Sequence, residues 1–215
     1  MKIFDISLPI KSKMAHWPGD PPVSLETLSA ISSGDNANVT LIQMSVHTGT
    51  HIDAPKHFLD HGQTIDQLPL DKLMGETLVM EIPANEKIIS GEVLSSHPEK
   101  YILEKVRKVL FKTTNSQLWM SDPEEFHKDY VAIDTEGAEF LADLGLDLVG
   151  VDYLSIAPYD ETTRPHQILL SKDIILLEGI YLADVQPGIY QMFCLPLNIE
   201  NVEGAPARAI LIQND

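Results

Sequence analysis

The chain has 215 residues, of which 44% are hydrophobic, and this is enough to bury one sizeable core, so we expect a single domain over residues 1–215. Its 32 acidic and 15 basic residues give a formal net charge of -17, which argues against nucleic acid or an anionic membrane as a partner. A single cysteine excludes an internal disulfide and a cysteine-based zinc site.

The N-terminal segment predicts strands and a loop but no targeting signal. Residues 3–10 resemble a first strand, and the apolar run breaks at Asp5, so a signal-peptide core is lacking. No run approaches the roughly eighteen apolar residues that a membrane span needs, and we expect a cytoplasmic location. In the turn-rich loop at residues 16–22, Trp17 is either an apolar wall for a ligand or packing beneath the loop. Strands are expected at residues 23–28 and 39–46.

A histidine-rich stretch, HTGTHIDAPKH, follows directly at residues 47–57. An extended chain would place four of its side chains on one face, because all four occupy odd positions: His47, His51, Asp53 and His57. A helix is the alternative, since two histidines are four apart, but Gly49, the β-branched residues and Pro55 disfavour it.

The same stretch must also bend. A straight strand would separate residues 47 and 57 by roughly 33 Å, which is too far for one metal centre. We therefore expect bends at Gly49 and at residues 53–55. Imidazole and carboxylate together suit zinc, manganese or iron(II), and the competing interpretation is a polar loop that happens to contain histidines.

The rest of the chain alternates between predicted strands and helices. A short helical turn is expected at residues 66–75, and helices around 92–97 and over 135–144. Strands are expected at residues 77–82, 106–113, 131–133, 146–151, 189–196 and 207–212. The strand–helix–strand unit over residues 131–151 indicates a parallel pairing, whereas residues 152–165 have the composition of a polar loop. The expected class is α/β or α+β.

Two residues of the C-terminal half stand in apolar surroundings. Glu178 interrupts the apolar run over residues 174–182, so its carboxylate is expected to be buried and to need a partner or a metal. The alternatives are a glutamate that faces solvent from an edge strand or one that pairs with an arginine. Cys194 lies in a predicted buried strand, which favours a small core residue over a nucleophile.

The run HTGTHIDAPKHF, residues 47–58, resembles the signature of the metal-dependent kynurenine formamidase family, also called the cyclase family. Further pieces match that family in the same order: WPGD at residues 17–20, residues 134–152, LLEG at 176–179, and residues 195–209. The resemblance covers nearly the whole chain.

The resemblance implies two divalent metal ions, zinc first and manganese or iron as alternatives. His47, His51 and Asp53 would hold one ion, Asp53 and Glu178 would bridge to the second, and His166 would complete it. The general acid/base would be His57, and Trp17 would stack on a substrate ring. The implied fold is α/β of the swivelling β/β/α type, with a mixed inner sheet, an antiparallel outer sheet and helices on one side, assembled as a homodimer or homotetramer.

The implied activity is hydrolysis of a small aromatic amide. An aryl formamide such as N-formylkynurenine would yield the free amine and formate, since a bound divalent ion lowers the pKa of its water to about 7 and a second ion polarises the carbonyl. The alternatives are a cyclic aryl amide such as isatin, or a protein that binds metal and an aromatic ligand without turnover. His57 favours catalysis, because pure binding needs no base beside the bound water. A closed structural metal site is disfavoured by the all-N/O ligands.

Overall fold

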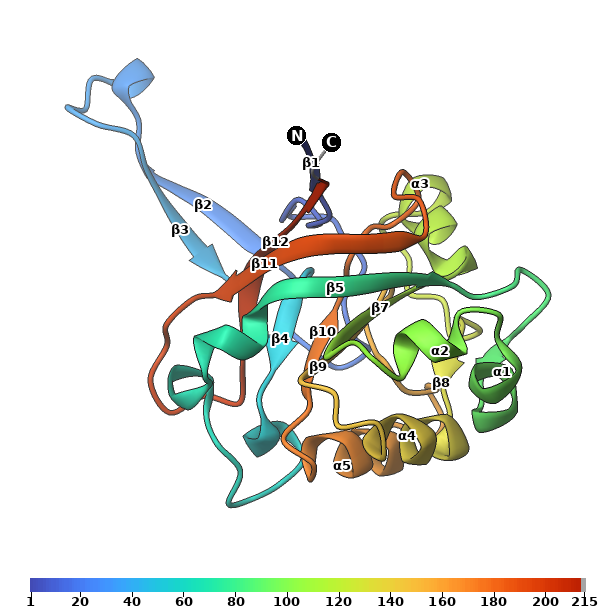
Figure 1. Ribbon diagram of the computed structural model, residues 1–215. Helices are drawn as coiled ribbons and strands as arrows, with labels where there is room; N and C mark the ends of the chain where they lie inside the picture. Colours follow the sequence, from blue (N-terminus) through green and yellow to red (C-terminus); the bar gives the residue numbers. More distant parts are fainter. Residues whose placement is uncertain (214–215) are drawn as a thin grey trace.

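The computed structural model describes residues 1–213, and an eight-stranded sheet forms its centre (Figure 1). The strand order is β1-β12-β11-β5-β7-β9-β10-β4, and β4 also pairs with β12, so the strands from β12 to β4 close into a barrel that β1 extends. The strands are β1 (Lys2–Asp5), β4 (His51–Asp53), β5 (Met74–Glu81), β7 (Lys108–Lys112), β9 (Leu148–Val151), β10 (Ile175–Glu178), β11 (Gly188–Pro196) and β12 (Gly204–Gln213).

Closure of the barrel differs from the two separate sheets that were expected. The parallel strands β5, β7, β9 and β10 and the antiparallel strands β11, β12 and β4 are arcs of one continuous sheet. The long strand β12 causes the closure, because residues 207–212 pair with β11 while residues 204–206 pair with β4, the strand at the other end of the order. The mixed α/β class is confirmed, and the division into an inner and an outer sheet is corrected.

Two small sheets lie outside the barrel. Strands β2 (Ser24–Ser29) and β3 (Val39–Gln43) form a hairpin that projects from the body, with the 3-10 turn η1 (Ile31–Ser33) near its tip (Figure 1). Strands β6 (Ile88–Ile89) and β8 (Ala132–Ile133) pair in parallel. The parallel pairing predicted within the strand–helix–strand unit is therefore wrong in its partner: β8 pairs with β6, and β7 and β10 occupy both edges of β9.

Helices gather on one side of the barrel, as expected for this class. Helices α1 (Gly91–Ser96), α2 (Lys100–Leu103), α4 (Thr135–Ala142) and α5 (Thr163–Leu170) share that side, and α3 (Leu118–Ser121) lies apart (Figure 1). Short 3-10 turns connect the strands at η2 (Pro55–His57), η3 (Ile65–Gln67), η4 (Leu70–Leu73) and η5 (Thr114–Gln117). Within residues 1–213, no helix combines the length and the apolar character that a membrane crossing requires.

The barrel wall separates two apolar cores. One fills the barrel interior and includes Ile52, Leu177 and Cys194, and the other lies between the barrel and the helices and includes Leu176 and Leu169. Burial raises the pKa of the Cys194 thiol to about 12, which agrees with a core residue and not a nucleophile. Because alternate residues of a strand face opposite cores, β4 and β10 present side chains both to the interior and to the helix side.

Candidate metal centre

Two bends fold the HTGTHIDAPKH stretch, at the positions where they were predicted. Gly49 has a φ of 65°, a left-handed conformation that favours glycine, and it turns the chain into β4. After β4, Pro55 begins the 3-10 turn η2, and the amide of His57 donates to the carbonyl of Ala54 at 2.9 Å. The stretch therefore wraps around one point instead of running straight.

The register of β4 and β10 selects which side chains meet. Ile52 and its partner Leu177 point into the barrel interior, so His51 and Asp53, on either side of Ile52, point to the helix side. Glu178 lies directly opposite His51 and shares that side. A strand pair thus places one imidazole and two carboxylates beside α5.

Helix α5 supplies His166 from a segment whose first part was predicted to be a polar loop. The helix begins at Thr163, and Pro165 is tolerated because it lies in the first turn, where the backbone N–H has no helical partner. Residues 165, 166, 169 and 170 are buried against the barrel. The predicted loop is confirmed over residues 152–162, but residues 152–157 of it are buried and residues 163–165 belong to the helix.

His51, Asp53, Glu178 and His166 converge although they are distant in sequence. His51 Nε2 lies 3.3 Å from Glu178 Oε2 and 3.5 Å from Asp53 Oδ1. His166 Nε2 lies 3.3 Å from Glu178 Oε1 and 3.8 Å from Asp53 Oδ2. Glu178 is buried and its described ion-pair partners are histidines, so it neither faces solvent nor pairs with an arginine.

Both histidines are oriented by backbone carbonyls. His51 Nδ1 lies 2.9 Å from the carbonyl oxygen of Gly49, and His166 Nδ1 lies 2.6 Å from that of Thr162. A carbonyl oxygen can only accept, so each Nδ1–H donates, which leaves the Nε2 lone pair directed at the carboxylates in the neutral ring. This is the arrangement that metal-binding histidines show in proteins.

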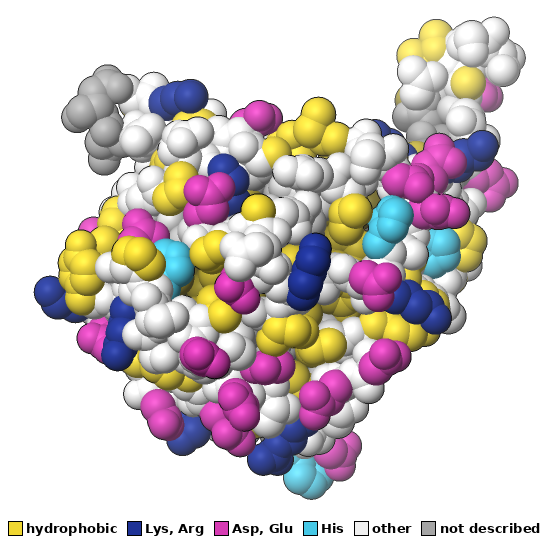
Figure 2. All heavy atoms as spheres, turned by 90° about the vertical axis from the view of Figure 1, so that its right-hand side faces the viewer, with side chains coloured by type: hydrophobic (Ala, Val, Ile, Leu, Met, Phe, Trp, Pro, Cys, Tyr) yellow, Lys and Arg dark blue, Asp and Glu magenta, His cyan; other side chains and the backbone are white. Residues whose placement is uncertain are grey.

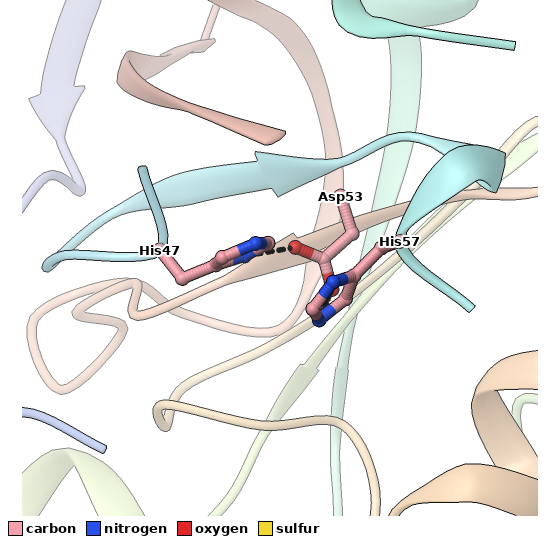
Figure 3. Close-up of side chains that lie close together, drawn as sticks. All are labelled: His47, Asp53 and His57. Carbon is pink, nitrogen blue, oxygen red and sulfur yellow. Dashed lines mark hydrogen bonds and ion pairs between the residues drawn. The ribbon is translucent and has the colours of Figure 1, made fainter. Parts of the chain in front are cut away.

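A second group shares Asp53 (Figure 3). His47 Nδ1 lies 2.8 Å from Asp53 Oδ1, and His57 Nε2 lies 3.9 Å from Asp53 Oδ2. The rings of His47 and His57 stack with their centroids 4.0 Å apart. Figure 3 shows the carboxylate of Asp53 directed at both rings. His57 therefore lies within reach of the cluster, and its role as a proton-transfer group instead of a ligand stays a prediction.

The residues fit two divalent cations. His47 Nε2 and Asp53 Oδ2 are buried without a hydrogen-bond partner, a costly state that a cation would relieve. Burial raises the pKa of Asp53, but the rings of His57, His47 and His51 outweigh it and hold that pKa well below its usual range. Two ligand groups, one with His47 and His57 and one with His51 and Glu178, meet at Asp53, and within each group the ligand atoms lie within 4.8 Å of one another. Nitrogen and oxygen donors of this kind suit Zn²⁺, Mn²⁺ or Fe²⁺.

We expect metal binding near neutral pH to release at least one proton. Burial lowers the pKa of His51, but Glu178 and Asp53 outweigh it and raise that pKa to about 9, so the metal-free ring is charged at pH 7. This charge stabilises the metal-free fold below pH about 6.5, and the contribution is lost as the pH rises through about 9. A metal must displace the proton, so its affinity falls about tenfold per pH unit on acidification. Calorimetry in buffers of different ionisation enthalpy measures the release, and zero protons at pH 7 would contradict it.

A cleft of about 170 Å³ opens beside the cluster, comparable to cavities of about 150 Å³ that hold a benzene ring. Trp17 lines it and also packs on Phe126 and Tyr159, with ring centroids 5.1 and 5.5 Å away. The packing interpretation of Trp17 is confirmed, and its role as a wall for a ligand stays a prediction. Asp20 and Phe58, from the two quoted family runs, also line the cleft, and it is completed by three residues that the sequence interpretation had not singled out: Leu154, Ser155 and Thr162.

Phe58 and Ile156, for which no role was predicted, shape the cluster itself. Phe58, which directly follows the motif, stacks on His166 with centroids 4.3 Å apart, and this adjacency was the available signal. The amide of Ile156 donates to Glu178 Oε1 at 2.7 Å, a backbone contact that leaves no trace in the sequence.

Comparison with known proteins agrees with this geometry. The sequence model of the Cyclase family matches residues 4–158. Cyclase-like protein 3 of Arabidopsis thaliana is 39% identical, over 99% of this chain and 80% of the relative. The kynurenine formamidase of Salinibacter ruber is 38% identical, over 98% of this chain and 97% of the relative.

Solved structures have the same fold. A protein described as a potential metal-dependent hydrolase with cyclase activity superimposes with a TM-score of 0.84 and 30% identity, over 100% of this chain and 98% of the other. Isatin hydrolase A of Labrenzia aggregata has a TM-score of 0.79 at 20% identity, over 100% of this chain and 94% of the other, a likeness of fold alone. With a family match over most of its length and near full-length relatives, this chain belongs to the cyclase family.

Proposed function

We propose that this protein is a metal-dependent amidohydrolase that cleaves an aryl formamide such as N-formylkynurenine to the free amine and formate. The observation that carries the proposal is the cleft in which Trp17 and Phe58 face the buried histidine and carboxylate cluster. An aromatic wall beside such a cluster suits a substrate with a ring next to a small amide. The near full-length similarity to the Salinibacter ruber kynurenine formamidase supports the same substrate class.

Two divalent ions, zinc first and manganese or iron as alternatives, would be held by the converging side chains. His47, His51 and Asp53 would hold one, and Asp53, Glu178 and His166 the other, with Asp53 shared because its carboxylate lies close to His47, His51 and His166. When bound, such ions lower the pKa of water and polarise a carbonyl oxygen. The buried ligands are kept rigid by Gly49, Thr162 and Ile156, which hold them through backbone atoms.

His57 is the residue that would move the proton. Its side chain is 28% exposed, whereas those of His51 and His166 are nearly buried, so it borders the cleft where substrate enters. Burial lowers the pKa of His57, partly opposed by Asp53, which keeps the ring neutral and able to accept a proton at pH 7. We infer that His57 takes a proton from the attacking water and returns it to the leaving amine.

Replacement of Trp17 by alanine should raise KM for aryl formamides while metal content is retained. The aromatic ring of the substrate would lose its stacking partner, which weakens binding by about 0.5–1.5 kcal/mol beyond the effect of the lost contact area. Steady-state kinetics on matched aryl and alkyl formamides measures the difference, with Trp17→Phe as the control that keeps an aromatic ring. Equal losses on both substrates would show that Trp17 acts only by packing on Phe126 and Tyr159.

A substrate screen tests the proposed reaction against its alternatives. Metal-loaded protein is offered N-formyl aromatic amines and isatin-like lactams, and release of formate or of the opened lactam is followed. Faster turnover of the formamides supports the proposal, whereas faster lactam opening assigns the chain to cyclic amides. Binding without turnover of either class would indicate a metal and aromatic-ligand binding protein. We further propose a cytoplasmic homodimer or homotetramer.

A further inference from the structure

A tight turn joins Trp17 to Asp20 at the cleft. The amide of Asp20 donates to the carbonyl oxygen of Trp17 at 3.0 Å, and Gly19 between them has a φ of 103°, a left-handed conformation that favours glycine. Proline followed by such a glycine is typical of a type II turn, in which the first and fourth Cα atoms lie less than about 7 Å apart. The turn therefore holds the Trp17 ring and the Asp20 carboxylate close together, and both line the cleft.

Burial divides the cleft into a floor and a rim. On the floor, His51, Glu178 and Leu154 are between 1% and 4% exposed, whereas Trp17 and Asp20 are half-buried and belong to the rim. One aromatic ring fills most of a cleft of about 170 Å³, since a cavity of about 150 Å³ holds benzene. A larger substituent on that ring must therefore extend past the rim, where Asp20 lies.

Asp20 is the carboxylate of the cleft that the metal centre does not use. Among the described residues that line the cleft there is no lysine or arginine, and the other carboxylate, that of Glu178, is a predicted metal ligand. Within residues 1–213, no hydrogen bond or ion pair engages the carboxylate of Asp20. Lys128 is held over the ring of Tyr159, with Nζ 4.5 Å from its centroid, and does not line the cleft. A cationic substituent would therefore find a partner at the rim, and an anionic one would be repelled.

We propose that Asp20 is a specificity-determining residue that selects substrates whose aromatic ring carries a positively charged amino group. With the ring on Trp17 and the amide at the metal centre, such a group would meet the Asp20 carboxylate at the rim and form a charge-assisted hydrogen bond. This role of Asp20 rests on the proposed hydrolase function and narrows its substrate class. N-formylkynurenine belongs to that class, because its amino-acid tail contains an ammonium group.

The charge of the whole molecule acts in the same direction. The chain has a net charge of -17, and Figure 2 shows acidic side chains spread over one face of the molecule. The exposed residues Asp160 and Glu161 directly precede Thr162, another half-buried residue of the cleft. A field of this sign attracts a cationic substrate over a long range, whereas contact with Asp20 acts at short range. Removing a surface carboxylate separates the two contributions.

Binding of three matched amines tests the role of Asp20 without any need for turnover. The ligands 3-aminobenzylamine, 3-aminobenzyl alcohol and 3-aminobenzoate share one ring and carry a cationic, a neutral and an anionic substituent. In calorimetry on the metal-loaded protein, Asp20→Asn should raise the Kd of the cationic amine about 3- to 10-fold. The Kd of the neutral amine should stay within about twofold, and that of the anionic amine should not rise. Asparagine keeps the size of the side chain and the backbone amide of the turn.

Asp60→Asn is the matched control. It makes the same change in net charge at a side chain that is 92% exposed and does not line the cleft, so all three Kd values should stay within about twofold of the wild type. Equal effects of the two variants would overturn the role of Asp20. The same holds if Asp20→Asn changes the Kd of the cationic and the neutral amine equally, or if the wild type binds the cationic amine no more tightly than the neutral one.

Kinetics on the same three amines, formylated at the ring nitrogen, separate the role of Asp20 from the proposed function. Asp20→Asn should raise KM for the cationic formamide with little change in kcat, because Asp20 lies at the rim and not at the metal centre. Hydrolysis without any charge preference would overturn the role of Asp20 and leave the hydrolase proposal standing. If no formamide is hydrolysed, the hydrolase proposal fails, while the binding of the three amines still decides whether Asp20 selects a cation.

Discussion

Replacement of His57 by alanine should lower kcat about 10²- to 10⁴-fold while metal content stays near that of the wild type. His57 borders the cleft, and burial keeps its pKa low enough for the ring to accept a proton at pH 7. The loss would fall on the chemical step, because all five predicted metal ligands remain. Metal analysis and steady-state kinetics on the same preparation measure both quantities.

Two other histidine variants serve as controls, one at a predicted metal ligand and one on the surface. His51→Ala should lose metal and activity together, since His51 is buried against Asp53 and Glu178. His61→Ala should change neither, because the side chain of His61 is 98% exposed on the surface. If the His57 variant loses metal as His51→Ala does, His57 is a ligand, and a near-normal kcat would remove it from catalysis.

Gly179→Ala should destabilise the fold and reduce metal binding together. A Cβ at Gly179 would lie 2.0 Å from the carbonyl oxygen of Gly49, and its φ of 65° already disfavours other residues. The left-handed conformation costs about 1–2 kcal/mol. The clash adds about 1–3 kcal/mol or more because a backbone carbonyl cannot rotate away. Since Glu178 precedes this glycine, relief of the clash would separate Glu178 from His51.

Gly34→Ala is the control that separates the cost of the left-handed conformation from the cost of the clash. Gly34 also has a left-handed φ, of 96°, but a Cβ there meets nothing within 4 Å. The free energy of unfolding should therefore fall by the conformational cost alone, and metal content should not change. If Gly179→Ala lowers the free energy of unfolding no more than Gly34→Ala does, the close contact between Gly179 and Gly49 does not hold the site together.

The local part of the site could be predicted because its chemistry is concentrated in sequence. The odd spacing of His47, His51 and Asp53, and the bends that Gly49 and Pro55 impose, follow from strand geometry within one stretch. Glu178 could be singled out as a carboxylate in an apolar run, a state that needs a partner. These inferences depend on a few neighbouring residues and not on topology.

The remaining features depend on contacts that local patterns do not encode. The helix that carries His166 begins at Thr163, and Pro165 in its first turn led the segment to be interpreted as a loop, while Thr162 makes no side-chain capping bond. The role of His166 came only from the family resemblance. Closure of the barrel depends on β12 pairing with both β11 and β4, a long-range register that the pattern of each single strand does not reveal.

Metal analysis of protein purified without chelator tests the central claim, that these residues form a two-ion centre. We expect two divalent ions per chain in the wild type, and loss of both in Asp53→Asn, because Asp53 contacts His47, His51, His57 and His166. Glu178→Gln should weaken the second ion most. A wild type that binds no divalent ion, or Asp53→Asn with full metal content, would contradict the account.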